Sequence, residues 1–265
     1  MKVVLFCGGL GMRLREHAEN VPKPLVPIGH RPILWHLMKY YAHFGHKDFI
    51  LCLGYNGDAI KRYFLDSQQY VTSDFVLSDG GRKRELIGAN CDDWRITFVD
   101  TGVNTCIGQR LKAVEHHLAG EETFLANYAD GLTDLPLPEQ IAHFRQRDVT
   151  ASFLSVMPNL SYHTVAVTND GLVTNLYDIA KSGIRVNGGY FVLRQDIFRH
   201  IRDGEDLVEQ PFQRLIDARK LAAYRYDGFW QPVDTAKDKN RVDELLTAGH
   251  PPWQVWRAKP GPTRG

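Results

Sequence analysis

Short apolar runs alternate with amphipathic segments along most of the chain. The runs that predict buried strands are residues 3–7, 48–54, 95–99, 123–128, 150–156, 188–193 and 222–226. Apolar positions recur at helical spacing between them, at residues 31–44, 57–64, 108–118, 138–147 and 209–219. Strands that alternate with helices in this way predict an α/β fold built on a single doubly wound, mostly parallel sheet.

Residues 163–176 interrupt this alternation. They form two short strand-like segments around Asn169-Asp170-Gly171, a strong hairpin signal, so we expect a small β-rich subregion there. The basic run at residues 82–84 is typical of a solvated loop. Without an internal repeat or a linker, the pattern predicts one domain over residues 1–255, followed by a flexible Pro/Gly-rich tail at residues 256–265.

Composition excludes several classes of partner. The 32 basic and 31 acidic residues leave a net charge of +1, so the basic excess expected of a nucleic-acid-binding protein is missing. No run approaches the ~20 apolar residues of a membrane span, and the first residues lack a signal-peptide pattern. The four cysteines, Cys7, Cys52, Cys91 and Cys106, form no C-x-x-C pair. We therefore expect reduced thiols and a cytoplasmic protein.

A glycine-rich turn follows the first predicted strand. Gly8, Gly9 and Gly11 let the backbone approach a phosphate and aim its N–H groups at the oxygens. Arg13 adds a forked donor, and Lys23 adds a point charge between two prolines. The turn matches neither a Walker loop nor a G-x-G-x-x-G fingerprint. Taken alone, it is equally consistent with a structural turn beside solvated basic residues.

Longer strings resolve that ambiguity. Gly8-Gly9-Leu10-Gly11-Met12-Arg13-Leu14, Pro22-Lys23-Pro24-Leu25-Val26, Tyr128-Ala129-Asp130-Gly131, Asn187-Gly188-Gly189-Tyr190-Phe191 and Trp230-Gln231-Pro232-Val233-Asp234-Thr235 occur in this order. The chain resembles the sugar-1-phosphate nucleotidyltransferases over residues 1–255, and within them most the glucose-1-phosphate cytidylyltransferases. The resemblance implies a Rossmann-like nucleotidyltransferase fold, a Mg²⁺ cofactor, CTP and a phosphorylated small molecule as partners, and a homo-oligomer.

The resemblance also implies roles for individual residues. The nucleotide-binding set is Phe6, Gly8, Gly9, Gly11, Met12, Arg13, Lys23, Gly102, Arg110 and Asp130, of which Arg13, Lys23 and Asp130 are the catalytic residues. Asp130 and Asp234 each follow an apolar run, and they match the family's metal-binding aspartates. A helix-capping turn remains the structural alternative for each aspartate, and a solvated helix face remains the alternative for Arg110.

The acceptor half of the chain departs from the family. Family members carry a Glu-Lys-Pro motif whose lysine binds the sugar phosphate; here Ile179 occupies that lysine position. Lys181 and Arg185 are the candidate substitutes, and Tyr162 and His163 alter the approach to the sugar. The full expected acceptor set is Tyr128, Lys181, Arg185, Asn187, Gly188 and Trp230.

Three questions therefore stay open at the level of sequence. The acceptor is glucose 1-phosphate by default, but another sugar phosphate, a non-sugar phosphate or a phosphonate remains an alternative. The nucleotide could equally be UTP or dTTP, because base choice rests on loop geometry. The lost Glu-Lys-Pro lysine also permits a non-catalytic nucleotide-binding paralogue.

Overall fold

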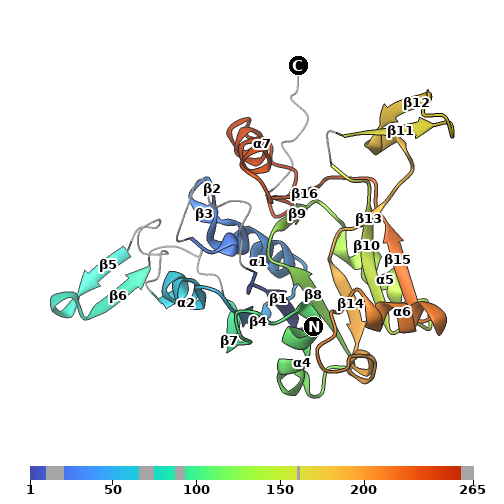
Figure 1. The fold of residues 1–265 in the computed structure, drawn as a ribbon. Coiled ribbons are helices and arrows are strands. Elements are labelled where there is room, and N and C mark those ends of the chain that lie inside the picture. Colours follow the sequence, from blue (N-terminus) through green and yellow to red (C-terminus); the bar gives the residue numbers. More distant parts are fainter. Residues whose placement is uncertain (10–20, 66–74, 87–92, 160–161, 258–265) are drawn as a thin grey trace.

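A central sheet organises the computed structural model, which describes residues 1–9, 21–65, 75–86, 93–159 and 162–257 (Figure 1). Its strands lie in the order β13-β10-β14-β8-β1-β4-β7, and β15 also pairs with β10. These strands are β1 (Val3–Phe6), β4 (Asp48–Leu53), β7 (Arg95–Asp100), β8 (Thr123–Tyr128), β10 (Ala151–Val156), β13 (Val186–Asn187), β14 (Phe191–Arg194) and β15 (Leu221–Arg225).

The half of the sheet that contains the N-terminal strand β1 consists of four parallel strands. β1 pairs with β4 on one side and β8 on the other, and β4 pairs with β7. The chain thus builds outward from β1 to β7 and then returns to the opposite side of β1. This reversal is a topological switch point, and the carboxyl ends of β1, β4, β7 and β8 meet at one edge there. The prediction of a doubly wound, mostly parallel sheet is confirmed; β14 and β13 pair antiparallel with their neighbours.

Successive residues of each strand face opposite sides, so the sheet carries a core on each face. Val3 and Leu5 pack in one buried cluster, while Val4 and Phe6 pack in the other. The first face is covered by α1 (Ile33–His43), α2 (Gly57–Leu65) and α5 (Leu137–Arg145), and the second by α4 (Ile107–Ala113) and α6 (Gln210–Asp217). Each large apolar side chain so buried stabilises the fold by about 1.5–3 kcal/mol before chain entropy is counted.

A third, smaller core lies above the carboxyl edge of the sheet. It joins Ile28, Ile33, Leu132, Val233, Val242 and Trp253. The elements around it are β2 (Pro27–Ile28), β3 (Arg31–Pro32), β9 (Gly131–Thr133), β16 (Trp230–Pro232) and α7 (Ala236–Thr247). The sequence pattern did not predict α7. Thr235 and Asp238 begin it with a reciprocal capping box, a signal that is present in the sequence.

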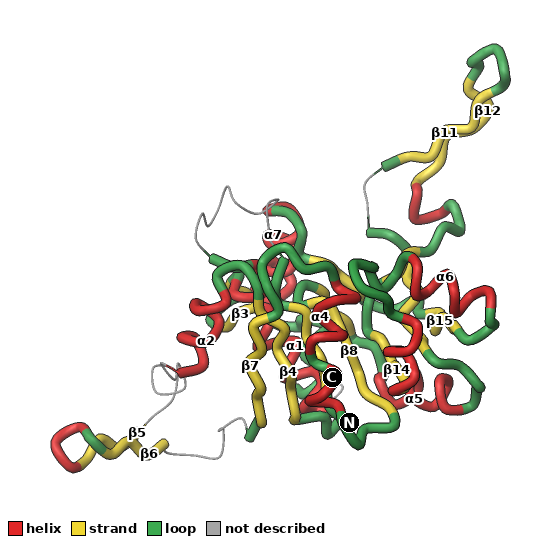
Figure 2. Tube along the Cα trace, turned by 60° about the horizontal axis from the view of Figure 1, so that its bottom comes forward, coloured by secondary structure: helices red, strands yellow, loops and turns green. Residues whose placement is uncertain are grey.

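Two hairpins project from opposite sides of the body (Figures 1 and 2). The one formed by β11 (His163–Val167) and β12 (Val173–Asp178) confirms the expected turn at residues 169–171. The other pairs β5 (Phe75–Ser78) with β6 (Lys83–Leu86). The expectation of a plain loop at residues 82–84 was therefore wrong, because Lys83 and Arg84 lie in a strand.

Several element boundaries also differ from the pattern. The helix expected at residues 108–118 ends at Ala113, and a 3-10 turn at Glu115–Leu118 continues it. The helix expected from residue 31 begins at Ile33, because Arg31 and Pro32 pair with β2. The strand expected from residue 188 begins at Phe191; Gly189 precedes it with a positive φ of 76°, which interrupts the extended backbone.

Near the end of the described chain, Trp253 is buried and Trp256 packs edge-on against Trp35, with ring centroids 6.0 Å apart. Cys7, Cys52 and Cys106 are free thiols, whereas Cys91 lies outside the described residues. Among the helices that the structure describes, none combines the length and the apolar character needed to cross a membrane.

Candidate active site

Three glycine turns meet at the carboxyl edge of the sheet. Gly8 follows β1, Gly54 follows β4 and Gly102 follows β7. A Cβ on Gly54 would lie 2.7 Å from the Gly8 oxygen and 2.9 Å from the Gly102 oxygen. Only glycine allows this close approach of three backbones. Gly9 is exposed, with open space around its Cβ position, so the turn presents bare backbone to solvent at this edge.

The side chain of Arg110 lies beneath these turns. It is buried on α4, and its two terminal nitrogens donate to the backbone oxygens of Leu53 (3.1 Å), Gly8 (3.0 Å) and Val103 (3.1 Å) and to the Thr101 hydroxyl (2.7 Å). Burial lowers the pKa of this guanidinium. Arg110 is thus beside the predicted nucleotide site, where it ties together the ends of β1, β4 and β7, and it is not on a solvated helix face.

Lys23 brings together two carboxylates from distant parts of the sequence. Its ammonium lies 2.6 Å from the Asp130 carboxylate and also bonds the Asp234 carboxylate. Burial alone would lower the pKa of Lys23, but the two carboxylates outweigh it and hold that pKa above its usual value. Lys23, Asp130 and Asp234 were predicted to share one site, and the structure brings all three together.

Backbone pairing fixes the two carboxylates relative to each other. Asp130 immediately precedes β9, and Asp234 follows β16 by two residues. β9 and β16 pair antiparallel, and the Val233 N–H donates to the Asp130 oxygen over 2.9 Å. The aspartates therefore sit at one end of a two-stranded ribbon, which explains how residues so distant in sequence share one cation.

This pair of carboxylates fits a magnesium ion. Hard oxygen donors are the ligands that Mg²⁺ uses in proteins, and it usually takes one or two carboxylates together with substrate phosphates. Asp130 and Asp234 already converge on a cation, the Lys23 ammonium. In the part of the chain that the structure describes, no group of three or more His, Cys, Asp or Glu side chains could hold a metal. A Mg²⁺ ion held by these two carboxylates would take its further ligands from substrate phosphates and water.

Four of the expected acceptor residues cluster beside these carboxylates. Trp230 donates its indole N–H to the Gly188 oxygen over 3.0 Å. A Cβ on Gly188 would lie 3.1 Å from the same indole nitrogen. The Asn187 side chain accepts from the Gly189 N–H (2.9 Å). Tyr128 ends β8, and burial, with Asp206 and Asp130 nearby, raises the pKa of its hydroxyl.

Phe6, predicted in the nucleotide set, is buried at the end of β1, and its ring contacts the Tyr128 ring with centroids 6.3 Å apart. Tyr128 also meets Phe191 edge-on at 5.4 Å. The Tyr128 ring therefore packs against the buried core that contains Phe6 and Phe191.

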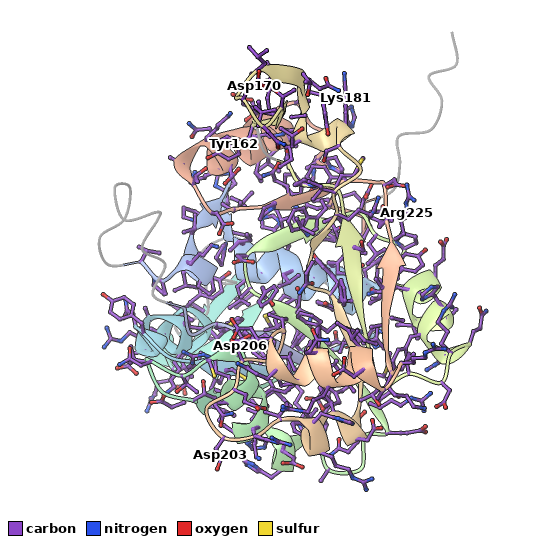
Figure 3. All side chains as sticks on the ribbon, turned by 45° about the vertical axis from the view of Figure 1, so that its right-hand side comes forward. Tyr162, Asp170, Lys181, Asp203, Asp206 and Arg225 are labelled. Atoms are coloured by element: carbon purple, nitrogen blue, oxygen red, sulfur yellow. The ribbon has the colours of Figure 1, made fainter. Side chains whose placement is uncertain are left out.

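The two candidate replacements for the lost lysine occupy different surroundings. Arg185 forms an ion pair with Asp227 (2.6 Å) and donates to the backbone oxygens of Ser155 and Tyr226, so most of its donors are engaged within the protein. Lys181 is exposed at the base of the β11–β12 hairpin, together with Tyr162 (Figure 3). Tyr162 is 67% exposed and therefore does not close off a buried pocket.

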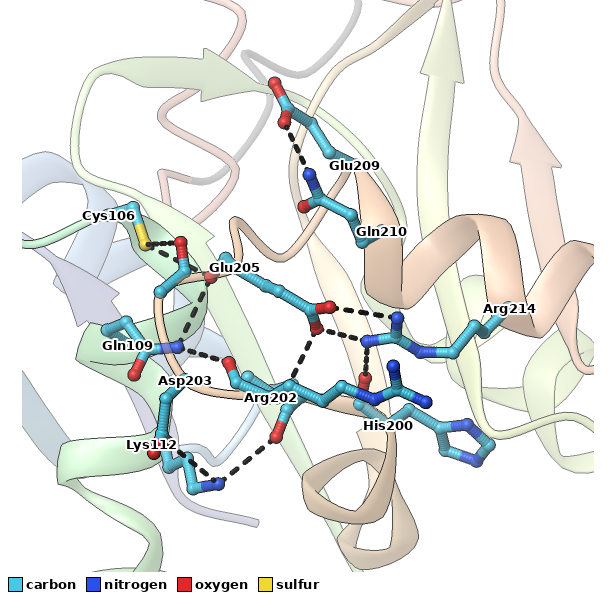
Figure 4. A network of polar contacts seen from close by, with 12 residues as sticks. Cys106, Gln109, Lys112, His200, Arg202, Asp203, Glu205, Glu209, Gln210 and Arg214 are labelled. Carbon is cyan, nitrogen blue, oxygen red and sulfur yellow. Dashed lines mark hydrogen bonds and ion pairs between the residues drawn. The ribbon is translucent and has the colours of Figure 1, made fainter.

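A loop that the sequence analysis missed holds α4 in place (Figure 4). Asp206 accepts the Ile107 N–H at the start of α4 (3.2 Å), and Arg214 pairs with Glu205. A Cβ on Gly108 would lie 2.3 Å from the Glu205 oxygen, so helix and loop are in direct contact. Since α4 carries Arg110, this loop helps to hold Arg110 under the glycine turns.

Two further residues escaped sequence analysis. Gly54 had a usable signal, because it follows a buried apolar run directly. Thr101, whose hydroxyl links Arg110 to the Leu53 oxygen, directly precedes the predicted Gly102, but nothing in the sequence assigned it this role. The predicted residues Gly11, Met12 and Arg13 lie outside the described residues.

A doubly wound sheet with bare glycine backbone and paired carboxylates at its switch point defines a phosphate-handling α/β protein. Comparison with known proteins is more specific. The family model described as "Nucleotidyl transferase" matches residues 2–242, and the chain belongs to that family.

The glucose-1-phosphate cytidylyltransferase of Salmonella typhimurium is 36% identical over 258 residues, covering 97% of this chain and 100% of the relative. The D-glycero-alpha-D-manno-heptose 1-phosphate guanylyltransferase of Campylobacter jejuni is 24% identical over 245 residues, covering 90% of this chain and 96% of the relative. The crystal structure of HddC from Yersinia pseudotuberculosis shares the fold, with a TM-score of 0.61 and 21% identity, over 92% of this chain and 99% of that one.

Proposed function

We propose that the protein transfers the cytidylyl group of CTP to a sugar 1-phosphate, by default glucose 1-phosphate, and releases pyrophosphate. One observation carries the chemistry: Lys23, Asp130 and Asp234 converge at the carboxyl edge of the sheet, beside the bare backbone after β1. The choice of CTP and glucose 1-phosphate is supported by the 36% identity to a relative named for them.

The proposed reaction is an in-line displacement at the α-phosphorus of CTP. An oxygen of the acceptor phosphate forms the new bond to phosphorus as the bond to the β-phosphate oxygen breaks, and the electron pair leaves with pyrophosphate. The protein supplies position and charge and forms no covalent intermediate. Bound Mg²⁺, held by Asp130 and Asp234, would neutralise charge on the phosphate oxygens.

The chain's own groups divide this work. The turn after β1 offers backbone N–H groups to the phosphates, and Lys23 provides an ammonium whose three donors allow it to bond a phosphate oxygen as well as the carboxylates. Tyr128, Asn187, Gly188 and Trp230, beside the carboxylates, would contact the acceptor.

The acceptor phosphate contact is the least conventional part of this proposal. Ile179 replaces the lysine of the family motif, and we propose that Lys181 or Arg185 takes its role. Lys181 is exposed and free to reorient toward a ligand, whereas Arg185 is engaged with Asp227. An acceptor other than glucose 1-phosphate, such as another sugar phosphate or a phosphonate, is the second candidate, and the altered motif favours it.

The test is a pyrophosphate-release assay with CTP, UTP, dTTP and GTP against a panel of sugar phosphates and phosphonates, with Mg²⁺. Asp130→Asn should lower kcat by at least about 100-fold, because a charge-stabilising group is lost, while the melting temperature stays near that of the wild type. Asp148→Asn is the matched control, because it makes the same chemical change at an exposed carboxylate that forms an ion pair with Lys220 on the surface.

The outcomes separate the alternatives. Pyrophosphate release with UTP or dTTP but not with CTP would show that the enzyme uses that nucleotide instead of CTP. Nucleotide binding without release for any acceptor would instead support a non-catalytic paralogue. Near-normal turnover in Asp130→Asn would remove that residue from the site.

We also propose that the enzyme works as a homo-oligomer in the cytoplasm. Val165 pairs with Leu176, and Val167 pairs with Val173, on one face of the β11–β12 hairpin, and all four side chains are more than half exposed. A lone two-stranded hairpin is marginally stable in water, so this exposed apolar face is the surface that we propose a second copy covers. Light scattering on the purified protein tests it, and a monomer at micromolar concentration would contradict it.

A further inference from the structure

The carboxylate of Asp234 is held through its backbone. Its side chain is 39% exposed and contacts Lys23, so the surrounding core does not lock its rotamer. Its backbone N–H donates to an oxygen of the Asp238 carboxylate over 3.2 Å. The same oxygen accepts from the Thr235 N–H (2.9 Å) and the Thr235 hydroxyl (2.8 Å). One oxygen of Asp238 thus fixes the two residues at the end of the ribbon.

The second oxygen of Asp238 ends a chain of polar contacts. It accepts from the Gln231 amide over 3.2 Å, and Gln231 is 1% exposed. The Gln231 oxygen accepts from the Asn159 amide, and the Asn159 oxygen accepts from Arg241 over 3.2 Å. Asn159 lies in the segment that leads from β10 toward the β11–β12 hairpin.

The donor and acceptor roles along this series of hydrogen bonds are set by the two residues at its ends. An arginine side chain only donates hydrogen bonds, and an ionised aspartate only accepts them. Arg241 therefore fixes the orientation of the Asn159 amide, which fixes that of Gln231, whose N–H group must face Asp238. A neutral amide in place of Asp238 cannot accept at both positions, so it breaks either the chain or the bonds to Asp234 and Thr235.

We propose that Asp238 is a positioning residue for the metal-binding carboxylate of Asp234, and that Gln231, Asn159 and Arg241 orient Asp238 for this role. The inference rests on the proposed function, because it assumes that Asp130 and Asp234 hold Mg²⁺. Groups that orient metal ligands typically change metal affinity or activity by about 10–100-fold when removed. A helix cap with no such role would affect stability alone.

The decisive comparison is Asp238→Asn against two variants of the same region. Asp243→Asn makes the same chemical change on the same helix, at a carboxylate paired with Lys239. Thr235→Ala removes the hydroxyl that caps α7 and that also donates to the Asp238 carboxylate, but keeps the bonds from the Asp234 and Thr235 N–H groups to that carboxylate. A merely structural effect of Asp238 should be reproduced by Thr235→Ala.

The first readout is the Mg²⁺ concentration that half-saturates pyrophosphate release. Asp238→Asn should raise it by about 10-fold or more, with kcat recovering at high Mg²⁺, and Gln231→Leu should raise it less. Asp243→Asn should leave it unchanged. The proposal is overturned if Asp238→Asn has the same Mg²⁺ dependence as Asp243→Asn, or if Thr235→Ala shifts it equally.

The second readout does not need turnover. Mn²⁺ binding in the presence of CTP, measured by titration calorimetry, should weaken by a similar factor in Asp238→Asn. In metal-free protein, hydrogen exchange at the amides of residues 234 and 235 should be faster in Asp238→Asn than in Asp243→Asn. If the wild type binds Mn²⁺ but releases no pyrophosphate, the proposed function is contradicted. Mn²⁺ affinity and hydrogen exchange in Asp238→Asn and Asp243→Asn would then still decide whether Asp238 positions Asp234. A wild type that binds no Mn²⁺ would overturn the positioning role.

Discussion

Replacing Arg110 by methionine tests how the glycine turns are held. Methionine keeps the unbranched apolar stem and removes the guanidinium. The oxygens of Gly8 and Val103 then lose the donor that Arg110 supplies, whereas the Leu53 oxygen keeps its bonds from the Thr101 N–H and hydroxyl. The variant therefore leaves two backbone oxygens to be satisfied in another way.

The expected loss follows from these two oxygens. An abandoned buried acceptor costs about 1–3 kcal/mol. Because the bond to the Gly8 oxygen is buried and the bond to the Val103 oxygen only partly so, Arg110→Met should lower the free energy of unfolding by about 3 kcal/mol. For a chain of this size, that corresponds to a fall in melting temperature of about 10 °C. Arg110→Lys keeps the charge and part of the bonding, and should lose about half as much.

The assay combines thermal unfolding with CTP binding by calorimetry. Both the melting temperature and the CTP affinity should fall in Arg110→Met, because the turns that approach the phosphates lose their support. An unchanged melting temperature with lost CTP affinity would refute this reasoning and make Arg110 a direct nucleotide ligand. Wild-type behaviour in both measurements would show that Arg110 does neither.

Three other substitutions test separate features. Burial, together with the positive charges of Arg257 and Arg31, outweighs a backbone hydrogen bond and lowers the pKa of His36 from 6.5 to about 4. Below pH 6.5 His36 is protonated in the unfolded chain but stays neutral in the folded chain. The free energy of unfolding should therefore fall by about 3 kcal/mol between pH 6.5 and 4. Urea unfolding across that range should show this loss in the wild type and a flatter profile in His36→Gln; equal slopes would contradict it. Gly54→Ala places a Cβ 2.7 Å from the Gly8 oxygen, and should cost about 1–3 kcal/mol by denaturant unfolding and weaken CTP binding. Lys181→Met should raise the KM for the sugar phosphate without changing the melting temperature; an unchanged KM would remove Lys181 from the acceptor site.

The order of the central strands and the helices between them was predictable because these strands are rich in consecutive apolar residues. Residues 49–53 and 124–126 are such runs, and the parallel crossover rule brings their carboxyl ends to one edge. The meeting of Asp130 with Asp234 depended on the family resemblance. The pairing of β9 with β16 brings these distant residues together. Each strand has only three residues, which is too short to produce a recognisable alternation of apolar and polar positions in the sequence.

Other features depend on tertiary contacts that a sequence does not display. Arg110 lies at helical spacing from the apolar Ile107 and Val114, but a charged side chain is ordinarily exposed, so its burial was not predicted. Its four partners come from three different loops or strand ends. Asp238 did carry a local signal, the capping pair with Thr235, yet its bond to Asp234 required the ribbon to end beside the helix.

The central claim is cytidylyl transfer at the site of Lys23, Asp130 and Asp234. Its most direct test is to incubate the protein with Mg²⁺, glucose 1-phosphate and CTP labelled at the α-phosphate, and to identify the labelled products. Label in CDP-glucose, with one pyrophosphate released for each molecule formed, is the expected result. Label that remains in CTP with every acceptor tried, or that appears as CMP, would contradict the account.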